Sequence, residues 1–374
     1  MNFMFACGGT AGHINPALAI AARLRERFPN CGILFIGTGR ELEKILIPKA
    51  GFSVVNIQMS GLRRGFSLKK IAYNINTAKN LITASREVKK LIKSFKPDVV
   101  IGTGGYVCYP VLRKAAKMKV PTIIHDSNAV GGLTTKMLSS IVDKVLVSFP
   151  NQEKQYKKPE RVIYTGTPVR IDFKNAATKS LKRTDKDLPL VVSFWGSLGA
   201  ERMNDIIADV IYLNIKNRVF NHIHAVGKKD GVDVVRERLS KPGLADEEVF
   251  PPGIEIKEYI ENMPEIMARA DLILCRGGGS TIAELMELKK PAIIIPSPHV
   301  ANNEQEYNAR QLSDIGGAIV LDEKGCNGEQ IYSTISSLVA NPQKLKKMSE
   351  NIETTALADT TGNVVNEILS LVKV

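Results

Sequence analysis

Cysteine is scarce in this sequence, and its spacing excludes two common roles. The five cysteines of the 374-residue chain are Cys7, Cys31, Cys108, Cys275 and Cys326. Their number is odd and none forms a C-x-x-C pair, so neither a disulfide framework nor a zinc site is indicated. We therefore expect reduced thiols, a reducing compartment and no resident metal.

Long apolar runs are also missing. No uninterrupted run approaches the ~18 residues that a membrane-spanning helix needs. The first apolar run, Asn2–Cys7, leads directly into glycines, which is unlike a secretory signal. We expect any membrane contact to be peripheral.

Several signatures of nucleotide and acyl chemistry are absent. There is no G-x-G-x-x-G fingerprint, no Walker lysine and no G-x-S-x-G elbow. This argues against a dinucleotide oxidoreductase, and we expect no cofactor. Asp185 and Asp187 have the D-x-D spacing of metal-dependent sugar transferases, but they precede a strand instead of following one. Metal use is therefore disfavoured.

Charge is distributed unevenly along the chain, whose formal net charge is +13. Through Pro168 there are 26 basic and 9 acidic residues, whereas the remainder has 25 and 29. A basic half indicates an anionic partner, either nucleic acid, an acidic membrane surface or a phosphorylated substrate.

The basic charge is concentrated in the segment 61–96. Its basic residues are Arg63, Arg64, Lys69, Lys70, Lys79, Arg86, Lys89, Lys90, Lys93 and Lys96. Interleaved apolar residues favour a surface that lies on anionic lipid, although a solvated helix face is the simpler alternative. Stacking aromatics are few, so we expect no nucleic-acid partner.

Short apolar runs alternate with helical patterns throughout the chain. The runs are 3–7, 33–36, 54–57, 99–101, 122–125, 145–149 and 162–164, then 190–194, 222–226, 272–275, 292–295 and 318–321. Such continuous runs indicate strands buried on both faces, and the alternation indicates parallel sheets. The pattern starts twice, so we predict an α/β protein with two Rossmann-like domains, 1–168 and 169–351. A helical segment, 352–374, is expected to pack back on the first domain.

Two glycine turns follow strands in the first domain. The first turn, Gly8–His13, is followed by Asn15 and Pro16, which suggest a helix N-cap and a first helical residue. The turn and the helix N-terminus together would form a phosphate cradle. A second turn, Gly102–Tyr106, follows the strand 99–101. The alternative for the first is a tight turn that only packs a strand against a helix, and for the second a turn that only leads into a helix.

Titratable and amide side chains gather at His125-Asp126-Ser127-Asn128, at the end of another strand. A carboxylate there is suited to act as a general base or to orient one. The alternative, a polar loop with an Asx turn, is equally compatible with these residues.

The second domain carries the most glycine-rich motif, Cys275–Glu284. Three consecutive glycines allow close approach to a diphosphate at the helix N-terminus, with Glu284 accepting from a ribose diol. Thr281 and Glu284 also match a capping box, which would make Glu284 structural. The polar run Asn302–Ala309 offers amides and carboxylates for sugar hydroxyls.

Together, these motifs resemble the MurG family of N-acetylglucosamine transferases. The resemblance runs in order through nearly the whole chain, at 8–13, 102–110, 125–128, 165–170, 196–200, 275–284 and 305–309. It implies a GT-B fold, two Rossmann-like domains whose parallel sheets face across a cleft. This sequence departs from the family pattern at Ala11, Asp126, Trp195 and Glu304.

The resemblance also implies roles for individual residues. UDP-GlcNAc would be bound by Thr10, Ala11, Gly12, Asn128, Arg170, Ser197, Ile260, Gly279, Ser280, Thr281, Ile282, Ala283, Glu284 and Gln305. The acceptor diphosphate would be bound by Gly8, Gly9, Gly104, Gly105 and Tyr106. His13 is the first candidate for the general base and Asp126 the second, unless the two act together.

The implied reaction inverts the sugar linkage, moving GlcNAc from UDP-GlcNAc to the muramoyl 4-hydroxyl of lipid I, the undecaprenyl-diphosphate-linked muramoyl-pentapeptide. The product, lipid II, serves peptidoglycan synthesis. The enzyme would lie on the cytoplasmic face of the cell membrane, with anionic inner-leaflet lipid and other cell-wall synthesis proteins as partners. A diacylglycerol glycosyltransferase is the alternative enzyme, and a sugar-nucleotide sensor is the non-catalytic one.

Overall fold

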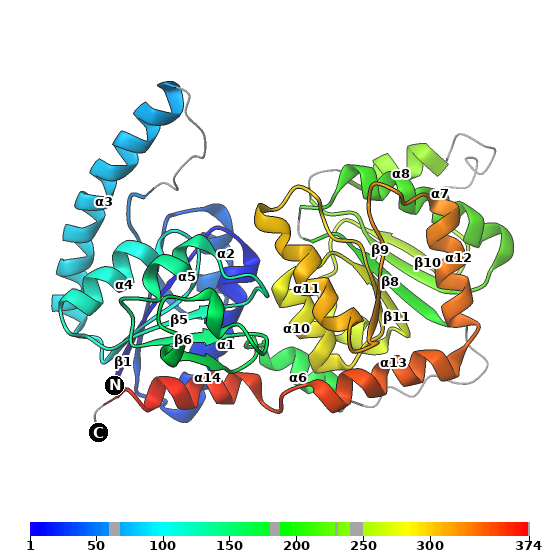
Figure 1. The fold of residues 1–374 in the computed structure, drawn as a ribbon. Helices are drawn as coiled ribbons and strands as arrows, with labels where there is room; N and C mark the ends of the chain where they lie inside the picture. Colours follow the sequence, from blue (N-terminus) through cyan, green and yellow to red (C-terminus); the bar gives the residue numbers. More distant parts are fainter. Residues whose placement is uncertain (60–67, 180–187, 197, 229–230, 240–249, 373–374) are drawn as a thin grey trace. The chain divides into compact units, whose positions relative to one another are not determined.

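A computed structural model describes residues 1–59, 68–179, 188–196, 198–228, 231–239 and 250–372. The chain divides into two compact units (Figure 1). Unit 1 comprises Met1–Arg170 and Leu357–Val374, and unit 2 comprises Ile171–Ala356. The predicted final segment, 352–374, thus includes the end of one helix in unit 2 as well as a separate helix in unit 1.

Unit 1 is built on a parallel sheet in the order β3-β2-β1-β4-β5-β6-β7. Its strands are β1 (Asn2–Cys7), β2 (Gly32–Gly37), β3 (Ser53–Asn56), β4 (Val99–Gly104), β5 (Thr122–Asp126), β6 (Lys144–Val147) and β7 (Val162–Tyr164). Its helices are α1 (Ala11–Arg27), α2 (Glu41–Lys49), α3 (Leu68–Phe95), α4 (Cys108–Lys117), α5 (Leu133–Leu138), η1 (Glu153–Gln155), η2 (Pro159–Arg161) and α14 (Thr360–Leu369).

Unit 2 is built on a parallel sheet in the order β10-β9-β8-β11-β12-β13. Its strands are β8 (Leu190–Phe194), β9 (Asn221–Ala225), β10 (Ile254–Lys257), β11 (Leu272–Cys275), β12 (Ala292–Ile294) and β13 (Ala318–Val320). Its helices are α6 (Ile171–Thr178), α7 (Glu201–Asn217), α8 (Gly231–Leu239), α9 (Met263–Arg269), α10 (Gly279–Leu288), η4 (Ala301–Asn303), α11 (Glu304–Ser313), α12 (Gly328–Val339) and α13 (Pro342–Thr355).

Strand β1 shows why the strands read as continuous apolar runs. Its side chains alternate between two hydrophobic clusters, one on each face of the sheet. Phe3 and Phe5 pack against α1 and α14, whereas Met4 and Ala6 pack on the face covered by α3 and α4. Both faces are dry, so neither set of positions is polar.

Two local predictions need correction. Strand β10 was not expected, because its sequence Ile-Glu-Ile-Lys alternates as an edge strand does and forms no continuous apolar run. Helix α1 begins at Ala11 with Thr10 as N-cap, so Asn15 and Pro16 lie inside it. Pro16 has no N–H, yet it lies close enough to the helix start for the first turn to form through His13 N and Ile14 N, which both donate to Thr10 O.

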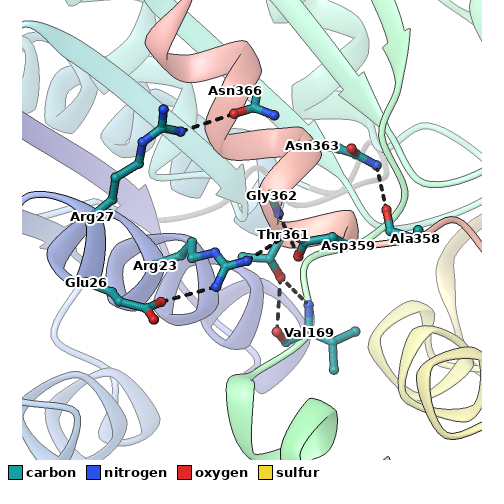
Figure 2. A network of polar contacts seen from close by, with 10 residues as sticks. All are labelled: Arg23, Glu26, Arg27, Val169, Ala358, Asp359, Thr361, Gly362, Asn363 and Asn366. Atoms are coloured by element: carbon teal, nitrogen blue, oxygen red, sulfur yellow. Dashed lines mark hydrogen bonds and ion pairs between the residues drawn. The ribbon is translucent and has the colours of Figure 1, made fainter.

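The C-terminal helix α14 completes unit 1. Val364, Val365 and Ile368 are buried in the same cluster as α1. Polar contacts surround this apolar seam: Arg23 donates to Asp359, Arg27 donates to Asn366, and Thr361 exchanges hydrogen bonds with the backbone of Val169 (Figure 2). The docking is therefore apolar at its centre and polar at its rim.

Replacement of Ile368 by alanine should destabilise unit 1 by about 2–5 kcal/mol, because it leaves a cavity at a fully buried position. Urea denaturation, with hydrogen exchange of the β1 amides as the local probe, measures this effect. The matched control is Ile45→Ala, since Ile45 belongs to the same unit and is 46% exposed. Equal losses in both variants would contradict a packing role for α14.

Candidate active site

The glycine turns lie where each sheet reverses its strand order. In unit 1 this point falls between β1 and β4, and in unit 2 between β8 and β11. Loops that diverge from neighbouring strands leave a crevice at their carboxyl ends, which is where open α/β sheets bind ligands. The turns 8–13 and 104–106 follow β1 and β4 at the first point, and Gly196, Gly199 and the glycines 277–279 follow β8 and β11 at the second.

His13 lies on the first turn of α1, three residues after the N-cap. Its Nδ1 lies 2.9 Å from Gly8 O. A carbonyl only accepts, so the bond fixes the proton on Nδ1 and leaves the Nε2 lone pair available in the neutral ring. The imidazole packs on Gly104, where a Cβ would come within 2.2 Å of its Cδ2.

A carboxylate that was not predicted from the sequence lies beside this turn. Glu43, on the first turn of α2, is fully buried. Its two oxygens accept from the backbone N–H groups of Gly9, Thr38, Gly39 and Arg40 and from the Thr38 hydroxyl. The signal was a third glycine turn, Gly37–Gly39, with a glutamate soon after it.

The glycines around Glu43 and His13 serve close packing. A Cβ on Gly8 would lie 2.4 Å from Glu43 Oε1, and one on Gly105 would lie 2.5 Å from Gly8 O. Gly104 and Gly105 also have positive φ angles of 124° and 86°. Tyr106 follows them, and the Arg40 guanidinium lies 5.5 Å from its ring centre.

Asp126 is held by its own loop. Its Oδ1 accepts from Asn128 N at 3.2 Å and its Oδ2 from Gly132 N at 2.8 Å. The Asx turn predicted as an alternative is thus confirmed, and its hydrogen bond to Asn128 N fixes the position of the Asn128 backbone. One strand, β4, separates Asp126 at the end of β5 from the turn that carries His13.

His125 is a structural residue at the end of the same strand. Its Nε2 donates to Gly166 O at 2.9 Å, which ties β5 to the segment leading to Arg170 at the end of unit 1. Burial lowers the pKa of His125, although the bond to Gly166 and the nearby Asp126 oppose the shift. The neutral ring is therefore the native form.

In unit 2, α10 begins at Gly279 and its N-cap is Gly278. Its first intrahelical bond runs from Ile282 N to Gly278 O, so the predicted residues 279–284 form the N-terminal turns of the helix. The capping-box alternative is wrong, because Thr281 lies three residues inside the helix and is not its N-cap. Glu284 lies one turn further on, near Cys275. Burial raises the pKa of the Cys275 thiol, and the charge of Glu284 raises it further.

The polar run 302–309 packs against the same glycine turn. A Cβ on Gly277 would lie 2.2 Å from Gln305 O, and buried Asn308 donates to Gly277 O at 2.9 Å. Gln305 Oε1 accepts from Ser297 N, which orients its amide. Ile260 is buried in the loop between β10 and α9. Strand β9 separates the edge strand β10 from β8, where the strand order reverses.

Trp195, at a position where the resembling family has glycine, is buried next to an ion pair. The Arg276 guanidinium lies 5.6 Å from the Trp195 ring centre and pairs with Glu323 at 2.5 Å. Arg276 also donates to Ile295 O. The larger residue is thus absorbed into the core at the carboxyl ends of β8, β11 and β12.

A buried polar cluster lies behind Trp195. The Ser193 hydroxyl contacts His222 Nε2 at 2.8 Å and His224 Nδ1 at 2.7 Å, and His224 Nε2 contacts Asn204 Oδ1 at 3.2 Å. Burial lowers the pKa of His222 to about 4 and that of His224 to about 3. Both rings are neutral at pH 7.

Some predicted features lie outside the described residues, namely Ser197, Asp185, Asp187, Arg63 and Arg64. Thr10, Ala11 and Gly12 form the start of α1, and the Thr10 side chain makes no capping bond. Within the described ranges, no cluster of three or more His, Cys, Asp or Glu side chains is arranged to hold a metal. None of the helices in those ranges combines the length and apolarity needed to cross a membrane.

Comparison with known proteins agrees with this architecture. Residues 3–147 match the glycosyltransferase family 28 N-terminal domain, and residues 190–363 match the corresponding C-terminal domain. The crystal structure of Acinetobacter baumannii MurG aligns over 99% of both chains with a TM-score of 0.74 and 26% identity. A UDP-GlcNAc 2-epimerase from Neisseria meningitidis shares the fold at 14% identity, with a TM-score of 0.65 over 99% of this chain and all of that one. The molecule is a glycosyltransferase of the GT-B fold.

Relatives that align over almost the whole chain identify the family within the glycosyltransferases. A UDP-N-acetylglucosamine–N-acetylmuramyl-(pentapeptide) pyrophosphoryl-undecaprenol N-acetylglucosamine transferase from Acetivibrio thermocellus is 40% identical over all of this chain and 99% of its own. The protein of the same name from Caldanaerobacter subterraneus subsp. tengcongensis is 39% identical over 96% of both. This chain belongs to the MurG family.

The buried histidines predict that unit 2 loses stability in mild acid. An unfolded histidine has a pKa near 6.5, so as pH falls the unfolded state binds the proton before the folded one does. Stability from His222 is complete above about pH 6.5 and falls towards pH 4, by on the order of 3 kcal/mol. Urea unfolding at several pH values, followed by fluorescence of the only tryptophan, Trp195, measures it.

The variant His222→Gln should flatten this pH dependence, whereas His299→Gln, at an exposed position, should not. An unchanged slope in His222→Gln would contradict the assignment.

Proposed function

We propose that this enzyme transfers N-acetylglucosamine from UDP-GlcNAc to the 4-hydroxyl of the muramoyl sugar of lipid I, giving lipid II for peptidoglycan synthesis. The observation that carries the proposal is 40% identity over the entire chain with a transferase of that name. The glycine turns at both sheet reversal points support it, since they suit the two diphosphates of the reaction.

We assign the donor to unit 2. The N-terminal turn of α10, residues 279–283, would face the diphosphate, because a helix N-terminus favours anions. Glu284, which follows these residues on the same helix, would accept hydrogen bonds from the ribose diol. Gln305 would present its amide to GlcNAc hydroxyls, and the backbone of Ile260 would contact uracil. The proposal keeps Ser197 as a further donor contact.

The first unit would contribute Thr10, Ala11, Gly12, Asn128 and Arg170 to the donor, and Gly8, Gly9, Gly104, Gly105 and Tyr106 to the acceptor diphosphate. Gly9, Gly104 and Gly105 support this role because they are only partly buried and lie near helix starts. Arg170 would offset the charge that develops on UDP.

His13 is the base we propose. The acceptor hydroxyl oxygen forms a bond to the anomeric carbon, while the bond from that carbon to the UDP oxygen breaks and its electron pair leaves with UDP. The hydroxyl proton passes to His13 Nε2, and the ring becomes an imidazolium whose Nδ1–H stays on Gly8 O. Attack opposite the leaving group inverts the linkage.

Asp126 is less suited to that task, because both of its oxygens already accept backbone N–H groups. We assign it a positioning role: it holds the loop that carries Asn128.

We also propose that unit 1 contacts the anionic cytoplasmic face of the cell membrane. The C-terminal half of α3 is two-sided: Ala84, Val88 and Ile92 are buried in unit 1, whereas Lys89, Lys90 and Lys93 are exposed. A row of exposed lysines attracts acidic lipid. Other cell-wall synthesis proteins remain candidate partners.

The transfer reaction is tested with radiolabelled UDP-GlcNAc and a short-chain lipid I analogue. Wild type should form the lipid II analogue, and His13→Ala should lower kcat by about 10²–10⁴-fold, the usual contribution of a general base. Asp126→Asn should lose less, and its thermal stability should fall with its activity.

If wild type binds UDP yet uses diacylglycerol in place of the lipid I analogue, the acceptor assignment is wrong. If His13→Ala retains full kcat, the base assignment is wrong although the transfer reaction stands.

Membrane contact is tested by vesicle co-sedimentation. Replacement of Lys89, Lys90 and Lys93 by glutamate should weaken binding to phosphatidylglycerol vesicles severalfold, and added salt should weaken wild-type binding as well. The matched control replaces three exposed lysines of α13, Lys344, Lys346 and Lys347, which changes the net charge equally. Equal losses in both triple variants would point to a general effect of net charge.

A further inference from the structure

The buried Glu43 carboxylate and the His13 imidazole contact the two ends of one peptide group. Glu43 Oε1 accepts from Gly9 N at 3.0 Å, and His13 Nδ1 donates to Gly8 O at 2.9 Å. Gly8 O and Gly9 N belong to the same peptide bond. In a trans peptide the C=O and N–H point in opposite directions, so the carboxylate lies on one side and the imidazole on the other.

A carboxylate at the N–H end of a peptide makes its carbonyl oxygen a stronger acceptor. Hydrogen bonds in series polarise one another, and the effect is larger where water is excluded. Glu43 is fully buried, and five donors surround its two oxygens, which is the environment of an ionised carboxylate. The carboxylate thus polarises the peptide group and increases the negative partial charge on Gly8 O, which accepts the hydrogen bond from Nδ1.

The surrounding glycines keep this chain of bonds in place. Gly8 leaves room for the carboxylate, Gly104 seats the imidazole, and Gly105 packs against Gly8 O. A side chain at any of the three would displace one partner. This demand is separate from any contact that the same glycines make with substrate.

Other titratable groups lie around the peptide. The Arg40 guanidinium lies 3.8 Å from the position of a Cβ on Gly9 and stacks near Tyr106. Cys7 on β1 and Cys108 on α4 are buried thiols, and burial raises the pKa of both, that of Cys108 to about 12. These thiols are neutral at pH 7. Glu43 and Arg40 are charged groups beside the turn, and Asp126 at the end of β5 is a further carboxylate close enough to help raise the pKa of Cys108.

We propose that Glu43 is a positioning residue that acts on His13 through the Gly8–Gly9 peptide, fixing the Nδ1–H tautomer and strengthening Nε2 as a proton acceptor. The arrangement corresponds to a carboxylate–histidine pair with one peptide group inserted between its members. It rests on the proposed role of His13 as the base.

The ring itself can be observed without turnover. Long-range ¹H–¹⁵N spectra of protein labelled at its five histidines report the tautomer and protonation of each ring, and His13→Gln assigns the signal. The neutral His13 ring should carry its proton on Nδ1. In Glu43→Gln, the pH at which this ring protonates should fall by about 0.5–1 unit.

A second variant is expected to act in the opposite direction. The Thr38 hydroxyl donates to Glu43 Oε1, the oxygen that also accepts from Gly9 N. Thr38→Val removes that competing donor and keeps the charge, so the His13 ring should protonate at a higher pH. This variant also tests the proposal if Glu43→Gln fails to fold. The matched control is Glu41→Gln, at an exposed position on the same helix.

The same variants are then compared in the transfer assay. In Glu43→Gln, kcat should fall about 10-fold or more while KM for UDP-GlcNAc stays near the wild-type value, and the acid limb of the kcat/KM profile should move to lower pH. Glu43→Asp, which keeps the charge, should recover part of this loss.

A proton on Nε2 in the neutral ring, or no change of the His13 titration in both Glu43→Gln and Thr38→Val, would overturn the proposal. If the His13 titration shifts as expected but wild type transfers no sugar, the action of Glu43 on His13 is supported and the proposed function is wrong.

Discussion

Burial of both faces of a parallel sheet is the constraint on which the rest of this molecule depends. A strand covered by helices on each side has room for a polar side chain only where a second polar group pairs with it, as Ser193, His222 and His224 do in unit 2. Polar groups that can reach a ligand are therefore gathered in the loops at the strand ends, and the reversal of strand order selects one pair of loops in each unit. The glycine turns occupy these positions because backbone must come close there to side chains, to other backbone and to the ligands we propose.

The same constraint explains which strands and helix boundaries could be predicted from the sequence. Twelve strands were visible as apolar runs, and in the central ones burial on both faces leaves no alternation, as β1 shows with its residues shared between two clusters. The edge strand β10 was invisible to that criterion. The start of α1 was misplaced because Pro16 is typical of a first helical position, and only the backbone shows that Thr10 caps the helix. That difference decides where His13 lies.

Site residues were predictable by type but less so by task. Glycine turns at strand ends indicated anion binding, yet Gly8, Gly104 and Gly105 also have packing duties that only neighbouring atoms reveal. Glu43 escaped notice because a single glutamate on a short helix has no sequence signature of burial, and its partners come from two separate turns. Asp126 was predicted as an acid–base residue from its place at a strand end, and only the structure shows that both of its oxygens accept backbone N–H groups.

The return of the chain to unit 1 has a consequence for its synthesis. The cluster formed by α1 and β1 lacks Val364, Val365 and Ile368 until α14 has been made. Unit 2 is continuous in sequence and is synthesised entirely before α14, whereas unit 1 keeps an apolar face uncovered until α14 follows. The half of the enzyme that carries His13 is therefore begun first and completed last.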